Sequence, residues 1–448
     1  MPPPTTEPHE ASQIPVCDPP PQPSRRATRV LLLAIVALAV AGRLAATFAF
    51  GKGSQSGTEY GNIGWHIRHG WGYRITLTHI YDDSPRMKSH WMMPFYPCVL
   101  AASKVVSPRS YTYVYVLQSL AAGAVACIVF RLARGIYGAR AGLLSAALFA
   151  LYPSFVYSCI VPHPLCWELA ALPLALLACL GYLARPTRWR LAGCAAATLW
   201  AAYIRSAWVV LVPVVVVLMA AEGGGWRRMW RSALAFCLLV AVGLAPWVAR
   251  NYVELGVVRL TSIDFPLWEG HNALGNATGY GPGGRNVVSV RGSYPELAAE
   301  LEERKHDGEV AILSVFRRAA LEEIRRRPWQ QLAVLPATRA FYFVLWDPYH
   351  PKSRHWLLYR IPYLALLAAA IAGLLVAWRR PTPWSRFGLW SVVAVWVAGC
   401  VTVAAFHYLP RFRMPAELMF MLPAGYFGDR ALAWLGRHRA PRAGEATP

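Results

Sequence analysis

Long runs of apolar residues dominate this chain, and shorter polar stretches separate them. A helix needs about 20 residues to cross a bilayer, and several runs approach or exceed that length. The runs are continuous rather than alternating, which is typical of helices and excludes a membrane β-barrel. The pattern predicts an all-α polytopic membrane protein with about ten transmembrane helices. The predicted spans are residues 28–50, 110–131, 139–160, 163–184, 190–206, 207–221, 231–249, 357–378, 386–407 and 414–435.

Two places in this pattern leave a choice. Residues 190–206 and 207–221 are short and meet at Arg205, and merging them would put a charge in the middle of the membrane, where it is costly. Residues 331–346 could also cross, but Arg339 within them favours a helix that lies in the membrane interface. We therefore predict two separate spans in the first place and an interfacial helix in the second.

The polar stretches set the domain organisation. Residues 1–27 are rich in Pro, Ser and Thr, which predicts a disordered cytoplasmic tail. Residues 28–435 form the transmembrane domain, and 436–448 form a second cytoplasmic tail. Two large external segments interrupt the domain, at 51–109 and 250–356.

The second external segment has two parts of different character. Residues 250–284 are rich in Gly, Asn and aromatic residues and predict a loop with short strands. Residues 295–328 combine helical periodicity with strong charge. They predict two solvated amphipathic helices.

Composition supports this picture, because 56% of the 448 residues are hydrophobic and only 15% are charged. The formal charge of +22 gathers in short Arg-rich loops that alternate with charge-poor ones. By the positive-inside rule the Arg-rich loops and both tails are cytoplasmic, so the two external segments face a periplasm-like space. We expect a multi-pass protein of a bacterial inner membrane. The basic excess would meet anionic lipid or a lipid-phosphate substrate, and no nucleic-acid signature is present.

Metal and cofactor patterns are lacking in the sequence. The nine Cys form no CxxC pair, and most lie inside apolar runs as small hydrophobic residues. His66 and His69 share one helical face, but no HExxH or DxD-type pair accompanies them. We expect no cofactor and no metal site, with a divalent metal left open.

Candidate chemistry concentrates in residues 51–97, just outside the first predicted span. A carboxylate at a membrane surface can take a proton from a hydroxyl, particularly where partial burial raises its pKa. Glu59 is our first candidate for such a base. Asp82 and Asp83 are rivals in the same segment, although DDSP is also typical of a turn before Pro85.

A lipid phosphate that leaves during a reaction would need cations near its charge. Near helix ends the alternative is snorkelling of the side chain towards the interface. Arg411 and Arg413 lie in RFRMP, which we interpret as an extended, Pro-bounded stretch in which the two Arg cannot both usefully face lipid. The candidate cations are Lys88, Arg205, Arg250, Arg411 and Arg413.

Several stretches, taken in order, resemble the polyprenyl-phosphate-sugar-dependent glycosyltransferases of the GT-C type, in the branch of the protein O-mannosyltransferases and the lipid A aminoarabinose transferase (family 39-like). The resemblance covers roughly residues 28–435. Two departures are visible: Glu59 stands where many members have Asp, and Lys88 lies six residues before Pro94 rather than directly before it. The matching stretches are Glu59–Ile63, Gly70–Tyr73, Pro94–Pro97, Pro246–Tyr252, Trp268–Asn272 and His407–Pro415.

The resemblance implies an inverting transfer of a sugar from a polyprenyl-phosphate-linked donor to a hydroxyl of a lipid, glycan or protein acceptor. It implies Glu59 as base, with Asp264, Glu269 or no base as alternatives. A surface-glycan polymerase or ligase, or a flippase of lipid-linked sugars, are rival functions, although no internal repeat suggests a transporter. The implied substrate contacts are Tyr60, Lys88, His90, Arg205, Arg250, Asn251, Glu269, His271, Arg411 and Arg413.

Overall fold

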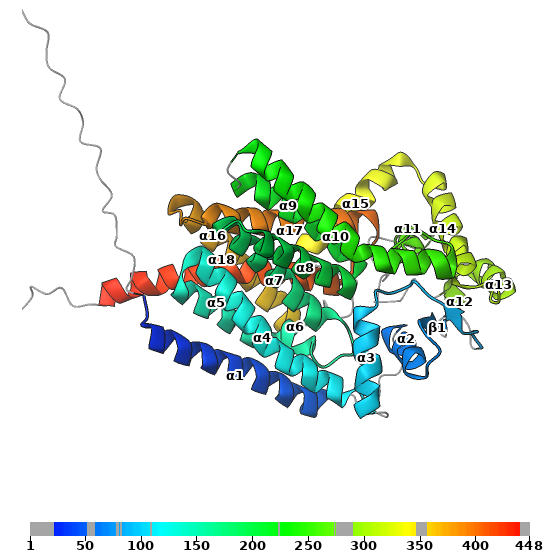
Figure 1. Cartoon of the computed structure of the whole chain (residues 1–448), viewed down its shortest axis with the longest axis horizontal. Coiled ribbons are helices and arrows are strands. Elements are labelled where there is room, and N and C mark those ends of the chain that lie inside the picture. Colours follow the sequence, from blue (N-terminus) through cyan, green and yellow to red (C-terminus); the bar gives the residue numbers. More distant parts are fainter. Residues whose placement is uncertain are drawn as a thin grey trace, which may run out of the picture.

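A computed structural model describes residues 22–51, 59–77, 80, 83–107, 110–222, 225–272, 274, 290–345 and 356–439. Long helices lie side by side along the longest axis of the molecule, and short elements gather at one end (Figure 1). Both ends of the described chain lie at the opposite end of this bundle. The bundle helices are α1 (Arg25–Phe50), α4 (Thr112–Tyr137), α5 (Ala139–Leu151), α7 (Leu165–Ala184), α8 (Arg188–Ile204), α9 (Leu211–Glu222), α10 (Trp226–Leu255), α16 (Ile361–Arg379), α17 (Ser385–Ala405) and α18 (Pro410–Arg439).

Among the described residues, six of these helices are long and apolar enough to cross a membrane: α1, α4, α7, α10, α16 and α17. Shorter apolar helices include α5 and the run Ser206–Ala221. Each predicted span coincides with a helix or a broken helix, so the prediction of an all-α polytopic membrane protein is confirmed.

The predicted span 139–160 is broken in the structure into α5 and α6 (Pro153–Tyr157). Pro153 has no amide hydrogen and ends the hydrogen-bond ladder, which leaves carbonyl groups at the end of α5 without helical partners. Arg43 of α1 is fully buried and donates to these groups, at 3.1 Å from both the Phe149 and Ala150 oxygens. The break allows the chain to turn back before α7, and His163 lies in that turn.

The seam at Arg205 is also a break. Helix α8 ends at Ile204, Arg205 adopts an extended conformation with φ −153° and ψ 129°, and a 3₁₀ turn, η1 (Ser206–Val210), leads into α9. The break therefore lies at the residue where the sequence divides the two predicted spans. The break takes Arg205 out of the regular helix, at the junction of α8 and η1.

The two external segments fold together beyond the bundle. They share one apolar core, in which Trp91 and Ile63 of the first segment pack with Trp268 and Phe316 of the second. The predicted pair of amphipathic helices is present as α13 and α14. The elements are α2 (Glu59–Arg68), β1 (Arg74–Ile75), β2 (Met87–Lys88), α3 (Phe95–Val106), α11 (Asp264–His271), α12 (Val290–Ser293), α13 (Pro295–Glu303), α14 (Glu309–Arg326) and α15 (Trp329–Val344), with the π-helical turn η4 (Trp356–Arg360) leading into α16.

Two local predictions are wrong. No strand occurs in the described part of residues 250–284, because Asp264–His271 is helical and packs Phe265 and Trp268 onto Phe316 of α14. The RFRMP stretch is not extended, because α18 begins at Pro410. Residues two positions apart in sequence are about 200° apart around a helix axis, so Arg411 and Arg413 point to nearly opposite sides of α18.

Candidate functional site

Helix α2 brings Glu59 and Tyr60 to the end of the bundle. A Cβ added to Gly64 would lie 2.9 Å from the Pro97 carbonyl oxygen, so only glycine allows α2 to lie this close to α3. The Tyr60 ring packs edge-on against Tyr96 at 5.5 Å and against His163 at 5.9 Å. Glu59 opens the helix and is partly exposed.

Arg205 is held by a buried acidic partner. Its Nε lies 3.3 Å from Glu168 Oε1, and its Nη2 lies 3.3 Å from His163 Nε2. The Trp208 indole donates to the other oxygen of Glu168 at 3.0 Å. The Glu168 side chain is 2% exposed, so the pair is a buried ion pair at the junction of α7, α8 and η1. The Arg205 guanidinium also faces the Phe412 ring, at 5.4 Å.

A second acidic group, Glu269 of α11, lies beside His407 in the link between α17 and α18. Glu269 Oε2 is 3.5 Å from His407 Nε2. Burial raises the pKa of Glu269 to about 7, with Arg411 opposing the rise and Glu59 adding to it. Burial and the charges of Arg411 and Arg339 lower the pKa of His407 to about 3. At neutral pH the imidazole of His407 is therefore neutral.

Electrostatic coupling joins these groups into one cluster. Glu59 and Arg411 both act on the pKa of Glu269. Burial raises the pKa of Tyr60, and the charge of Arg205 opposes that rise. We name this set the rim cluster. Its members are Glu59, Tyr60, His163, Glu168, Arg205, Glu269, His407, Arg411 and Phe412.

The raised pKa of Glu269 predicts how the stability of the fold depends on pH. A carboxyl whose pKa rises from 4.5 to about 7 on folding stabilises the fold fully below about pH 4.5, and this contribution is lost as pH rises through about 7. Glu269→Gln cannot ionise, so we expect its thermal midpoint to match wild type near pH 4.5 and to exceed it increasingly towards pH 7. Unfolding scans in detergent between these pH values measure the difference. Glu296→Gln, at an exposed site on α13, is the control. Parallel profiles for Glu269→Gln and wild type would contradict the argument.

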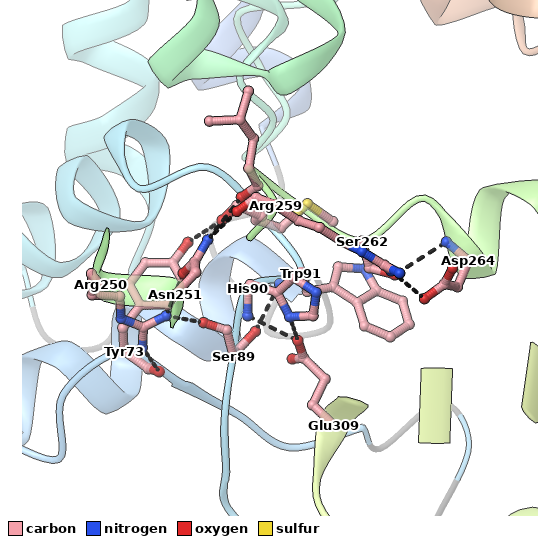
Figure 2. A network of polar contacts seen from close by, with 12 residues as sticks. Tyr73, Ser89, His90, Trp91, Arg250, Asn251, Arg259, Ser262, Asp264 and Glu309 are labelled. Carbon is pink, nitrogen blue, oxygen red and sulfur yellow. Dashed lines mark hydrogen bonds and ion pairs between the residues drawn. The ribbon is translucent and has the colours of Figure 1, made fainter. Parts of the chain in front are cut away.

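Arg250 and Asn251 lie outside the rim cluster, at the end of α10 (Figure 2). Arg250 donates to the carbonyl oxygens of Ser89 and of Tyr73, the latter at 3.2 Å. Asn251 donates to the Arg259 carbonyl oxygen at 2.8 Å. These contacts hold the first external segment to the chain that leaves α10.

His90 also joins the two external segments rather than the rim cluster (Figure 2). Its Nδ1 lies 2.7 Å from Glu309 Oε1, and both side chains are at most 1% exposed. Two further candidates of the first external segment form ion pairs at the surface. Lys88 Nζ lies 2.6 Å from Glu254, and Asp83 lies 3.0 Å from Lys305 Nζ. Asp82 lies outside the described residues.

His271 and Arg413 have structural partners near the rim cluster. His271 Nε2 lies 3.3 Å from the Ala405 carbonyl oxygen and 3.3 Å from Arg339 Nη1. Arg413 Nε lies 2.6 Å from Glu417 Oε1, and its guanidinium lies 3.8 Å from the centre of the Tyr363 ring. The structure thus brings Glu59, Tyr60, Arg205, Glu269 and Arg411 together and places the other described candidates elsewhere.

Sequence reasoning missed Glu168, His163 and His407. Glu168 had a usable signal, because it is the only acidic residue in the predicted span 163–184, and intramembrane carboxylates are seldom without a partner. His407 is the first residue of His407–Pro415, one of the stretches that carry the family resemblance. His163 gave no signal beyond its type. No group of three His, Cys, Asp or Glu suited to a metal ion occurs among the described residues.

The rim cluster combines what a group transfer from a phosphate requires. Carboxylates at Glu59 and Glu269 can accept a proton. Arg411 is exposed, and none of the described carboxylates forms an ion pair with it, so its guanidinium can meet an external anion. Arg205, in contrast, already forms an ion pair with Glu168.

No protein-family model and no curated sequence matches this chain. Among solved structures, an oligosaccharyltransferase of Archaeoglobus fulgidus tethered with an acceptor peptide superposes with a TM-score of 0.58 at 14% identity, over 93% of this chain and 51% of that chain. The oligosaccharyltransferase AglB of the same organism, in complex with an inhibitory peptide and a dolichol-phosphate, gives 0.56 at 14% identity, over 94% and 52%. ArnT of Cupriavidus metallidurans bound to undecaprenyl phosphate gives 0.43 at 14% identity, over 95% and 82%.

The two oligosaccharyltransferase superpositions, each with a TM-score above 0.5, establish the fold. The chain has the helical membrane architecture of these two structures, which is the GT-C architecture that the sequence resemblance implied. It spans about half the length of the oligosaccharyltransferase chains that it matches.

Proposed function

We propose that this chain is a membrane glycosyltransferase that moves a sugar from a polyprenyl-phosphate-linked donor to a hydroxyl of a cell-envelope acceptor. The observation that carries the proposal is the rim cluster, where the buried carboxyl of Glu269 lies within electrostatic range of both Glu59 and the exposed Arg411, on a GT-C fold. The solved neighbours support it, since one AglB structure holds a dolichol-phosphate and the ArnT structure holds undecaprenyl phosphate. The site would face the periplasm of a bacterial inner membrane.

The reaction proceeds by a single displacement. Glu59 takes the proton of the acceptor hydroxyl, and the oxygen attacks the anomeric carbon of the donor sugar. The bond between that carbon and the phosphate oxygen breaks, so the polyprenyl phosphate leaves with the electron pair. Attack opposite to the leaving group inverts the anomeric centre. Glu59 suits the role of base because it opens α2 at the rim and is partly exposed, within reach of an entering acceptor.

Arg411 binds the phosphate of the donor in this scheme. Its charge acts on Glu269, Tyr60 and His407, which places it at the centre of the rim cluster, and its guanidinium remains exposed. An Arg fork matches two phosphate oxygens and stabilises the charge that develops on the leaving group.

The variant Arg411→Ala tests this role. We expect the Kd for undecaprenyl phosphate to rise by about tenfold, since a hydrogen bond to a charged group contributes about 1.5 kcal/mol or more. Binding titrations of the full chain in nanodiscs measure the change. Arg325→Ala, which removes an exposed Arg of α14 outside the rim cluster, is the matched control. Equal affinities for wild type and Arg411→Ala would remove Arg411 from the phosphate site.

The function itself is tested with the full chain in nanodiscs, a labelled undecaprenyl-phosphate sugar and an envelope extract as acceptor. A glycosyltransferase releases undecaprenyl phosphate and moves the label onto the acceptor. A flippase moves the intact donor between leaflets in liposomes without breaking the sugar–phosphate bond. A surface-glycan polymerase or ligase breaks the same bond, and its label lies on a glycan. Intact donor after prolonged incubation with every acceptor fraction would overturn the proposal.

A further inference from the structure

Four rings and two Arg form a corner at the C-terminal end of α2. We name it the aromatic corner and define it by Trp65, His66, Arg68, His69, Trp71 and Arg86. The Trp65 ring lies 4.4 Å from His69 and 4.8 Å from Trp71, measured between ring centres. Trp65 is 44% exposed, although it is among the largest apolar side chains of the segment. No residue of this corner belongs to the rim cluster.

A tight turn fixes the corner. Gly70 and Gly72 have φ of 74° and 77°, a left-handed conformation that other residues adopt only with strain. The Trp71 amide donates to the His66 carbonyl oxygen at 3.1 Å, which folds the chain back over the end of α2. His69 Nδ1 lies 2.8 Å from the Trp65 carbonyl oxygen, so the protonated Nδ1 donates there and Nε2 remains as an acceptor on an exposed side chain. The rings are therefore ordered before any ligand arrives.

The position of the corner argues against an ordinary membrane belt. Trp residues gather at membrane interfaces near the ends of transmembrane helices. Helix α2 instead lies on the side of α3 that faces away from the bundle, beyond the ends of α1 and α4 (Figure 1). An exposed Trp face at this place fits a partner that comes from the aqueous side.

The charge of the corner is basic. The Arg86 guanidinium lies 3.5 Å from the centre of the Trp71 ring, and Arg68 is exposed one turn from Trp65. Neither Arg forms an ion pair with a described carboxylate. Lys104 of α3 lies close enough to Arg68 for the two charges to interact. The complementary partner therefore carries negative charge.

We infer that the aromatic corner binds an acidic oligosaccharide segment of the acceptor, with a sugar ring stacked on Trp65 and its acid groups held by Arg68 and Arg86. Trp faces offer apolar area to the C–H face of a sugar, while the neighbouring His and Arg donors and acceptors match its hydroxyl and acid groups. The inference rests on the proposed function and names its acceptor class.

The geometry connects the corner to the proposed base. Glu59 and Trp65 lie on the same short helix, six residues apart, which corresponds to a rise of about 9 Å. A short oligosaccharide covers that span. An acceptor glycan anchored at the aromatic corner can thus present a terminal hydroxyl near Glu59.

Binding alone tests the inference, with no donor present. The full chain in nanodiscs is titrated by calorimetry with a hexamer of galacturonic acid, and with maltohexaose as the neutral probe. We expect the acidic hexamer to bind, Trp65→Ala to raise its Kd at least about tenfold, and Arg86→Ala to raise it less at high salt than at low salt. Trp189→Ala is the matched control, because Trp189 is 76% exposed at the start of α8 and should leave the Kd unchanged.

The outcomes separate the inference from the proposed function. Absence of binding by wild type, equal binding of the neutral hexamer, or an unchanged Kd for Trp65→Ala would each overturn the inference. Sugar transfer onto a non-glycan acceptor, with the corner variants fully active, would do the same while the proposed function stands. If binding persists but no donor is ever cleaved, the proposed function fails instead.

Discussion

Glu59→Gln is expected to lower the rate of sugar transfer by about 10²–10⁴-fold, the range that a positioned general base contributes. The amide has the shape of the carboxylate but cannot accept the acceptor proton at neutral pH. The Kd for undecaprenyl phosphate should change little, because Arg411 and not Glu59 meets the phosphate in the proposed scheme. Single-turnover transfer by the full chain in nanodiscs separates the chemical step from binding.

Two further variants sharpen this result. Glu59→Asp keeps a carboxylate of the type that the resembling enzymes place here, so it should retain much of the activity lost in the Gln variant. Asp83→Asn removes a carboxylate of the same external segment that is 74% exposed and paired with Lys305, and it should leave transfer unchanged. Full activity of Glu59→Gln together with inactivity of Glu269→Gln would move the base to Glu269.

Local rules predicted much of the fold. Continuous apolar runs gave the bundle helices, and the cost of a charge within the membrane located the break at Arg205. Helical periodicity with strong charge gave α13 and α14. These features depend on short windows of sequence, where the polarity of a residue decides its environment.

The partners of charged residues could not be predicted, because they depend on packing between distant segments. Arg250 was a candidate for phosphate, yet it donates to the Ser89 and Tyr73 carbonyl oxygens, more than 150 residues away in sequence. His90 meets Glu309 for the same reason. Charge alone does not distinguish an Arg that binds substrate from one that satisfies buried carbonyl groups.

The shared core of the two external segments explains how the candidate site is assembled. Glu59 belongs to the first segment and Glu269 to the second, and each would be misplaced without the packing of Trp91 and Trp268 in one core. The buried His90–Glu309 pair and the Arg250 contacts join the same two segments (Figure 2). Glu59 and Glu269 are therefore positioned by residues that were first considered as substrate contacts.

Arg205→Met is expected to reduce the free energy of unfolding by about 3–5 kcal/mol, because it leaves the charge of Glu168 buried without its partner. Glu168 is 2% exposed, and the Trp208 indole would be the remaining hydrogen-bond donor shown for it. Unfolding by dodecyl sulfate in mixed micelles measures the loss. Lys88→Met is the matched control: its partner Glu254 lies at the surface, where solvent screens the pair, so the free energy of unfolding should change little.

The double variant Arg205→Met/Glu168→Leu decides whether the pair stabilises the fold or serves the site. Replacing both members of a buried ion pair by apolar groups is often neutral or stabilising, so the double variant should recover most of the stability lost in the single one. It should still transfer sugar poorly, since Arg205 also faces Phe412 and acts on Tyr60 beside Glu59. Recovery of stability without recovery of transfer would show that the ion pair is kept to position the rim cluster. Recovery of both stability and sugar transfer would show that Arg205 has only a structural role. If stability is not recovered, the main stabilising interaction of Arg205 is with a group other than Glu168.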